Sequence, residues 1–249
     1  MINISIDRLM KKLDEYLGKN DYLSAEKHLI YWLNEAKAEN DKRTELTITN
    51  ELIGLYRKIS NENKAIECVE TAIELVSKLE MEKEVSGATT YINCATTYKA
   101  FGRVEKSIDL FKKARDVYEK ELKCDDSRLA GLYNNMALTL VDLKNFDSAI
   151  KLYRKAISIL EENKNGELEI AITYLNIASC LEEKIGIEQA EQKINECVNI
   201  AQSLIDSFEN RNGYYAFVCE KCAGVFGYYG YFAYENELKK RARRIYEGA

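Results

Sequence analysis

Residues 130–160 have the sequence AGLYNNMALTLVDLKNFDSAIKLYRKAISIL, which decides the fold. Apolar and small residues recur in it at spacings of three and four, for example at Ala149, Tyr153 and Ala156, so they share one face of a helix. The polar stretch around Lys144 and Asn145 separates two such segments. Alternation with a period of two is missing. The sequence therefore predicts two helices joined by a short turn, and no sheet.

The same pattern recurs along the chain with a period of about 42 residues. Three first helices share an alanine, a tyrosine, an asparagine and a second alanine at fixed spacing. These are Ala88, Tyr91, Asn93 and Ala95; Ala130, Tyr133, Asn135 and Ala137; and Ala171, Tyr174, Asn176 and Ala178. Twelve residues after each second alanine stands a small residue: Ser107, Ala149 or Ala190. Fainter copies pair Ile53 with Ala65, Leu13 with Ala25, and Ala223 with Glu235, which makes six units.

The full match of Ala137, Ala149, Tyr153 and Ala156 resembles the tetratricopeptide repeat, and the long period resembles the kinesin light chain type. The resemblance implies an all-α, right-handed α-solenoid of six helix-turn-helix units whose first and last units act as caps. We expect one domain over residues 1–249. Its units lie near residues 5–40, 45–82, 86–124, 128–164, 168–209 and 213–247. One departure is that the chain contains no proline, which commonly ends the second helix of this repeat.

Composition narrows the class of protein. The chain has 249 residues, a net charge of -5 and no long uncharged apolar stretch, so neither nucleic acid nor a membrane is an expected partner. Seven cysteines without paired spacing indicate reduced thiols and a cytoplasmic location. Cys219 and Cys222 have the spacing of a redox or zinc motif, but the repeat register places both in the core. We find no nucleophile with a base, no metal cluster and no phosphate loop, and therefore predict no enzyme, cofactor or metal.

The recurring asparagine lies about 160° around its helix from the tyrosine two positions before it, and so faces away from the core. In this repeat fold the first helix lines a concave groove, and peptide-binding members use an asparagine ladder there. The resemblance thus implies peptide binding by Asn93, Asn135 and Asn176. Lys11 and Lys221 occupy the equivalent positions near the two ends, which indicates a local preference for acidic groups. The alternative is that these asparagines are neutral groove residues that prevent aggregation.

The C-terminal unit is rich in aromatic residues, with nine between Tyr214 and Tyr234. Packing within this unit is one explanation for Phe226 and Phe232. It leaves Tyr228 and Tyr229 as a candidate surface for a partner or for a homodimer. The basic run after them, Lys239, Lys240, Arg241, Arg243 and Arg244, is typical of the solvated face of a terminal helix.

The function predicted from these features is that of an adaptor or scaffold. Its groove would hold another protein or an extended peptide of unknown identity. Two alternatives remain open at this point. One is a regulator that responds to a short signalling peptide, and the other is a structural assembly subunit that uses the aromatic C-terminal unit.

Overall fold

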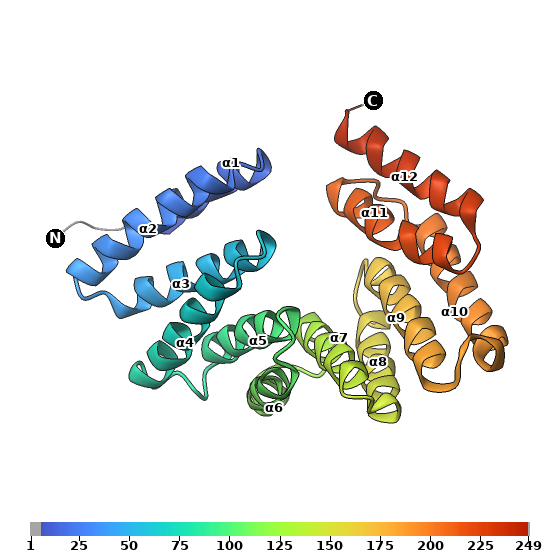
Figure 1. Cartoon of the computed structure of the whole chain (residues 1–249), viewed down its shortest axis with the longest axis horizontal. Helices are drawn as coiled ribbons and strands as arrows, with labels where there is room; N and C mark the ends of the chain where they lie inside the picture. The colour runs from blue at the N-terminus through green and yellow to red at the C-terminus, as the bar shows by residue number, and fades with distance from the viewer. Residues whose placement is uncertain (1–5, 249) are drawn as a thin grey trace. The chain divides into compact units, whose positions relative to one another are not determined.

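The structure is a computed structural model that describes residues 6–248. These residues form twelve α-helices, which pair in chain order as six helix-turn-helix hairpins (Figure 1). The helices are α1 (Ile6–Gly18), α2 (Tyr22–Ala38), α3 (Lys42–Lys58), α4 (Glu62–Lys78), α5 (Val85–Ala100), α6 (Val104–Glu121), α7 (Ser127–Asp142), α8 (Phe146–Glu161), α9 (Glu167–Ile185), α10 (Ile187–Ser207), α11 (Gly213–Tyr228) and α12 (Phe232–Tyr246). The predicted all-α class and the six helix-turn-helix units are confirmed.

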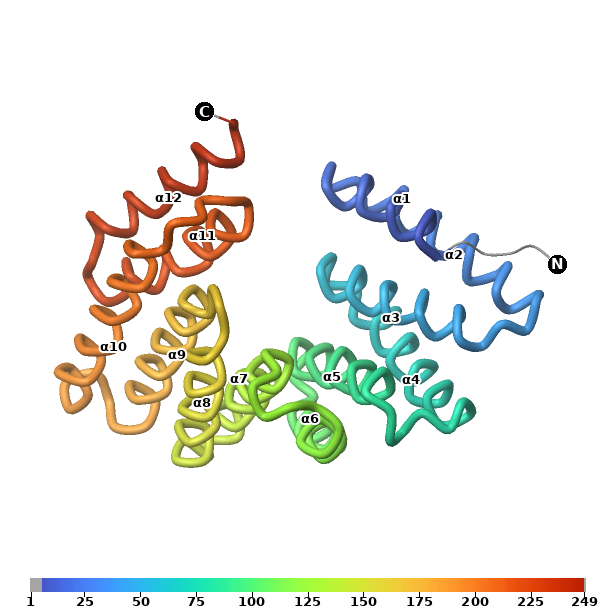
Figure 2. The backbone as a smooth tube through the Cα atoms, turned by 180° about the vertical axis from the view of Figure 1, so that it is seen from behind, coloured from blue at the N-terminus to red at the C-terminus, as the bar shows by residue number. Residues whose placement is uncertain are grey.

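The helices fall into two compact units. The first unit, residues 1–122, holds α1 to α6, and the second, residues 123–249, holds α7 to α12. Within the first unit α3 contacts its hairpin partner α4 and the first helix of the next hairpin, α5, and within the second unit α9 contacts α8, α10 and α11 (Figure 2). First helices of consecutive hairpins therefore touch inside each unit, namely α3 with α5 in the first unit and α9 with both α7 and α11 in the second. We call the surface that the odd-numbered helices form within a unit the first-helix face of that unit.

Left-handed residues, rather than proline, end many of the helices. Asn40 has a φ of 54°, and the next residue, Asp41, donates its backbone N–H to the carbonyl of Ala36 at 2.9 Å. This bond closes the end of α2 in the manner of a Schellman turn. The Asp41 side chain then accepts a hydrogen bond from the backbone N–H of Thr44 at 3.1 Å and caps α3. Two adjacent residues thus end one helix and begin the next, which explains how the chain turns without proline.

The small residues of the repeat pack in the core as predicted. The alanines at the helix crossings, such as Ala95, Ala137 and Ala178, are fully buried. Because the side chain of alanine is only a methyl group, two helix backbones can approach closely at these crossings. Larger side chains fill the space around them. Tyr91 and Tyr133 are buried beside them, whereas the equivalent Tyr174 is only half-buried.

All seven cysteines are free thiols, and Cys219 and Cys222 lie in the core of the second unit. Burial raises the pKa of the Cys222 thiol to about 12 and also raises that of Cys219. Both thiols therefore stay protonated near neutral pH and are weak nucleophiles. The core positions predicted for this pair from the repeat register are confirmed.

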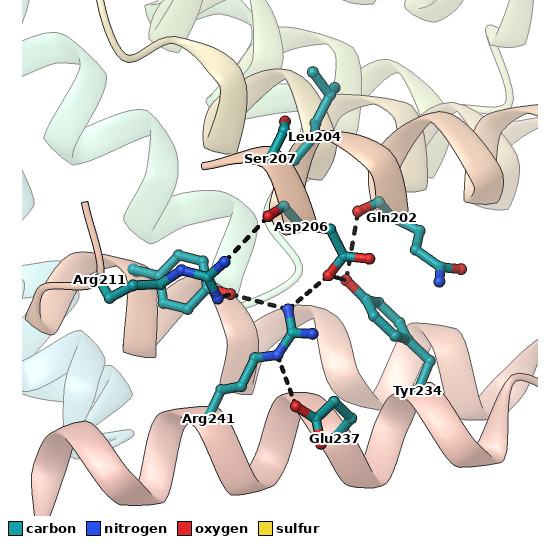
Figure 3. A network of polar contacts seen from close by, with 9 residues as sticks. Gln202, Leu204, Asp206, Ser207, Arg211, Tyr234, Glu237 and Arg241 are labelled. Carbon is teal, nitrogen blue, oxygen red and sulfur yellow. Dashed lines mark hydrogen bonds and ion pairs between the residues drawn. The ribbon is translucent and has the colours of Figure 1, made fainter. Parts of the chain in front are cut away.

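A polar network fastens the last hairpin to α10 (Figure 3). The Arg241 guanidinium of α12 donates to Asp206 Oδ1 at 2.6 Å, to the Tyr215 hydroxyl at 3.1 Å and to Glu237 Oε1 at 3.0 Å. The Tyr234 hydroxyl donates to the same Asp206 oxygen at 2.9 Å. Arg241 therefore has an internal structural role, unlike the exposed Arg243 and Arg244 of the same basic run.

Two further observations concern the surface. The packing explanation for Phe232 is wrong, because this side chain is 65% exposed while Phe226 is fully buried. Phe232 is the first residue of α12 and is not among the buried residues of that helix.

Across residues 6–248 none of the helices combines the length and the apolar character needed to cross a bilayer.

Candidate peptide-binding groove

A groove of about 480 Å³ runs between α3 and α5 on the first-helix face of the first unit. Hydroxyl and carboxamide side chains dominate its lining, together with one arginine, one glutamate and two apolar residues. The lining residues are Arg43, Leu46, Thr47, Asn50, Glu51, Met81, Ser86, Thr89, Thr90 and Asn93. Asn93, which the repeat pattern singled out, thus lines a cavity that is open to a ligand.

The carboxamide of Asn93 is held in place by a second asparagine. Asn93 Nδ2 donates to Asn50 Oδ1 at 3.1 Å. Asn50 in turn uses its own amide to donate to the Leu46 carbonyl at 3.1 Å and to Thr90 Oγ1 at 3.0 Å. These bonds occupy both N–H groups and one lone pair of Asn50. Asn93 keeps its carbonyl oxygen and one N–H for a ligand, in an orientation that Asn50 fixes.

The second unit repeats the contact between first helices. Asn134 Nδ2 donates to Thr173 Oγ1 at 3.0 Å, and Asn134 Oδ1 accepts from the same hydroxyl at 3.2 Å. Asn134 and Asn50 stand at the same repeat position, as do Thr173 and Thr90. Neither pair was predicted from the sequence, although an Asn followed about 40 residues later by a Thr in neighbouring first helices was a usable signal.

Asn135 and Asn176 differ from Asn93 in their surroundings. Both side chains are half-buried on α7 and α9, and neither makes a hydrogen bond within residues 6–248. Each carboxamide therefore offers its donors and its acceptor to a ligand. A peptide unit presents one N–H and one C=O, which is the complementary pair of groups.

The two lysines predicted at the ends of the ladder lie in different settings. Lys221 is exposed on α11. Lys11 lines a separate cavity of about 540 Å³ formed by α1 and α2, whose other lining residues are Arg8, Leu9, Lys12, Glu15, His28 and Trp32. The cavity holds one carboxylate, which pairs with Lys12 at 2.7 Å, and it does not include Asn93.

Glu51 gives the groove a carboxyl group whose proton affinity is altered. It occupies the asparagine position of the second repeat, two residues before Ile53. Burial, and to a smaller extent the negative charge of Asp14, raises the pKa of Glu51. Arg43 lies at the start of the same helix, α3, and is exposed. The groove therefore combines hydrogen-bonding groups with one charge of each sign, which suits recognition of a polypeptide.

Tyr228 and Tyr229 lie at the end of α11 in the second unit. The Tyr229 hydroxyl donates to Glu182 Oε2 at 2.9 Å, and the Tyr228 hydroxyl donates to the other oxygen of the same carboxylate. Tyr229 is half-buried, whereas Tyr228 is 66% exposed. The pair is thus anchored through its hydroxyl groups and presents ring surface to solvent.

Comparison with known families decides the classification. A model of the tetratricopeptide repeat family matches residues 44–120 and 128–203, which together make up more than half of the chain. The chain belongs to the tetratricopeptide repeat family. The matched stretches include Asn50, Asn93, Asn135 and Asn176, so the groove of the first unit and the two asparagines of the second unit all lie in tetratricopeptide repeats.

The long repeat type is also confirmed. This tetratricopeptide repeat chain is 23% identical over 155 residues to Protein KINESIN LIGHT CHAIN-RELATED 3 from Arabidopsis thaliana, a match that covers 61% of this chain. The chain spans about a quarter of the length of that curated relative, because the match covers 24% of it. The likeness therefore concerns the repeats.

Solved structures share the fold. BtubC (BKLC) from P. vanneervenii has a TM-score of 0.72 at 19% identity, with 82% of each chain covered. A Rap protein complexed with competence and sporulation factor has a TM-score of 0.63 at 15% identity, with 96% of this chain and 63% of that chain covered. At such identities the likeness shows a common tetratricopeptide repeat fold.

Proposed function

We propose that this tetratricopeptide repeat protein is a binding scaffold that holds an extended polypeptide segment on its first-helix face. The observation that carries the proposal is the contact of Asn93 with Asn50 at 3.1 Å. It fixes a carboxamide at the groove surface and leaves one donor and one acceptor free. Those groups complement a peptide unit, and a preoriented group loses less entropy on binding than a mobile one.

Asn135 and Asn176 extend the same role to the second unit. Their carboxamides are half-buried and make no hydrogen bond within the described residues, so binding a peptide costs no internal bond. Lys221 and Lys11 add positive charge, which favours acidic groups in the bound segment where it passes them. We further propose that the chain acts in the cytoplasm as one domain, by binding rather than by catalysis.

Mapping a bound peptide tests this proposal. A library of random linear peptides displayed on phage is selected on the full chain, and the tightest binder is made with a photo-crosslinking phenylalanine analogue. Mass spectrometry then identifies the attached residues. We expect crosslinks to α3 and α5 or to α7 and α9. Attachment confined to the even-numbered helices would overturn the proposal.

A second candidate is a regulator that responds to a signalling peptide. The fold of the Rap protein complexed with competence and sporulation factor supports this candidate, because the likeness covers 96% of this chain. The two candidates differ in what binding does to the protein. Hydrogen exchange on the peptide-bound chain separates them: a scaffold gains protection only around the groove, whereas a regulator also changes protection in helices that the peptide does not touch.

A further inference from the structure

A cavity of about 410 Å³ lies in the second unit between the start of α10 and the end of α11. The α10 side contributes Ile187, Glu188, Glu191 and Ile194, and the α11 side contributes Tyr228 and Tyr229. Because α10 is the second helix of its hairpin, this cavity is distinct from the groove that contains Asn93. We call it the tyrosine corner.

The two tyrosine rings give the tyrosine corner its shape. Their centroids lie 5.1 Å apart and their planes meet at 77°. Both hydroxyls donate to the carboxylate of Glu182, which holds the rings in this arrangement. Rings at nearly a right angle form two walls of a corner, and the face of a tyrosine attracts a cation through its quadrupole.

The charged groups of the tyrosine corner all have the same sign. Glu188 and Glu191 stand three residues apart on α10, where their side chains are neighbours and repel each other. Both are exposed, and neither forms an ion pair within residues 6–248. No lysine or arginine lines the cavity in the described part of the chain. The negative potential here is therefore not neutralised from within the protein.

The apolar residues complete the set of contacts that a long basic side chain needs. Ile187 is 49% exposed at the first turn of α10, and Ile194 lies two turns further on. Lysine and arginine bury their methylene stems on apolar surface while the charged end seeks an acceptor. A metal ion is not the expected ligand, because residues 6–248 contain no group of three or more His, Cys, Asp or Glu side chains placed to hold one.

We propose that the tyrosine corner binds a lysine or arginine side chain from a partner polypeptide. The stem packs on Ile187 and the tyrosine rings, and the cationic group lies between the ring faces and the carboxylates of Glu188 and Glu191. This site does not depend on the first-helix face. A partner can occupy the two surfaces separately or with different parts of one segment.

A titration of the full chain followed by NMR tests the proposal. The probes are Nα-acetyl-lysine N-methylamide, its arginine analogue, and the uncharged norleucine analogue of similar shape. We expect saturable shifts of the Tyr228 and Tyr229 ring signals with the two cationic probes and much smaller shifts with norleucine. Equal shifts with norleucine, or no shift with either cation, would overturn the proposal.

Variants separate charge from shape. Changing Glu188→Gln and Glu191→Gln together keeps the side-chain volume and should weaken binding of the lysine probe about fivefold. Tyr228→Leu removes one wall and should weaken it to a similar extent. Glu196→Gln, on the same helix but outside the cavity, is the matched control and should bind as the wild type does. Unchanged binding by the double glutamine variant would contradict a cation site.

A variant with Asn135→Ala and Asn176→Ala tests whether the two surfaces are independent. It should bind the lysine probe at the tyrosine corner as the wild type does, whether or not it still binds a peptide on the first-helix face.

Discussion

The Asn93 carboxamide donates a hydrogen bond of 3.1 Å to Asn50 Oδ1, a residue 43 positions earlier in the sequence. Through Asn50 it is tied to Thr90 on its own helix α5 and to the backbone of α3. A groove residue is thereby oriented by the packing of two hairpins. We call these three hydrogen bonds the Asn50 network. The Asn50 network should contribute to the stability of the first unit.

Removing the Asn50 network should destabilise the first unit. Asn50→Ala deletes three hydrogen bonds and leaves the half-buried Asn93 with a partner missing, so we expect the free energy of unfolding to fall by about 1 to 2 kcal/mol. Urea denaturation of the full chain measures this. Asn34→Ala, at an exposed position of α2, should change stability by less than about 0.5 kcal/mol. Equal effects of the two substitutions would show that the Asn50 network does not contribute to the free energy of unfolding.

Arg241 should hold the last hairpin in place. Arg241→Met keeps much of the stem but loses bonds to Asp206, Tyr215 and Glu237, which we expect to cost about 2 kcal/mol. The loss should appear as faster hydrogen exchange in α11 and α12. Arg243→Met on the exposed side of α12 is the control and should leave exchange unchanged. Similar exchange in both variants would argue against a structural role for Arg241.

Glu51 should make stability depend on pH in a defined sense. Its folded-state pKa is raised by burial and by Asp14, so its contribution to stability is fully present below the unfolded pKa of about 4.3 and is lost as pH rises through the folded value. Glu51→Gln should therefore be more stable than the wild type near pH 7, with the difference vanishing below about pH 4. Denaturation at several pH values measures it. A difference that grows on acidification would have the wrong sign.

Two glycines in first helices should respond oppositely to alanine. At Gly131 in α7 an added Cβ meets nothing within 4 Å, so Gly131→Ala should stabilise the protein by about 0.5 to 1 kcal/mol through the helix backbone. At Gly87 in α5 the same atom would lie 2.0 Å from the carbonyl oxygen of Met81, so Gly87→Ala should destabilise it. Melting temperatures of the two variants provide the comparison, and a shift in the same direction would contradict the packing described here.

The repeat register could be predicted from the sequence because it depends on the spacing of small and apolar residues within each helix. Ala137, Ala149 and Ala156 recur at helical intervals, and close helix crossings require small residues at such positions. The burial of Cys219 and Cys222 followed from the same register without any knowledge of the structure. Periodicity therefore determined the hairpins and their core.

Contacts between hairpins were not accessible in the same way. The bonds from Asn50 to Thr90 and from Asn134 to Thr173 join residues about 40 positions apart, and they depend on how one hairpin is seated on the next. Arg241 stood in a basic run that is typical of a solvated face, yet tertiary packing brings it to Asp206 and Tyr215. Packing within the last hairpin was one explanation for Phe232, and this side chain is exposed. The Asn–Thr pairs become visible only when neighbouring repeats are compared, and spacing within one helix does not predict the surroundings of Arg241 or Phe232.

The most direct test of peptide binding through the asparagines is the affinity of one selected peptide, measured by isothermal titration calorimetry. The proteins compared are the wild type, Asn93→Ala, the double variant Asn135→Ala, Asn176→Ala, and the control Asn34→Ala. A hydrogen bond contributes about 1 kcal/mol, so we predict that the variant in the unit that binds the peptide loses about fivefold or more in affinity, while the control matches the wild type. Wild-type affinity in both asparagine variants, with the fold intact by circular dichroism, would contradict the proposed function.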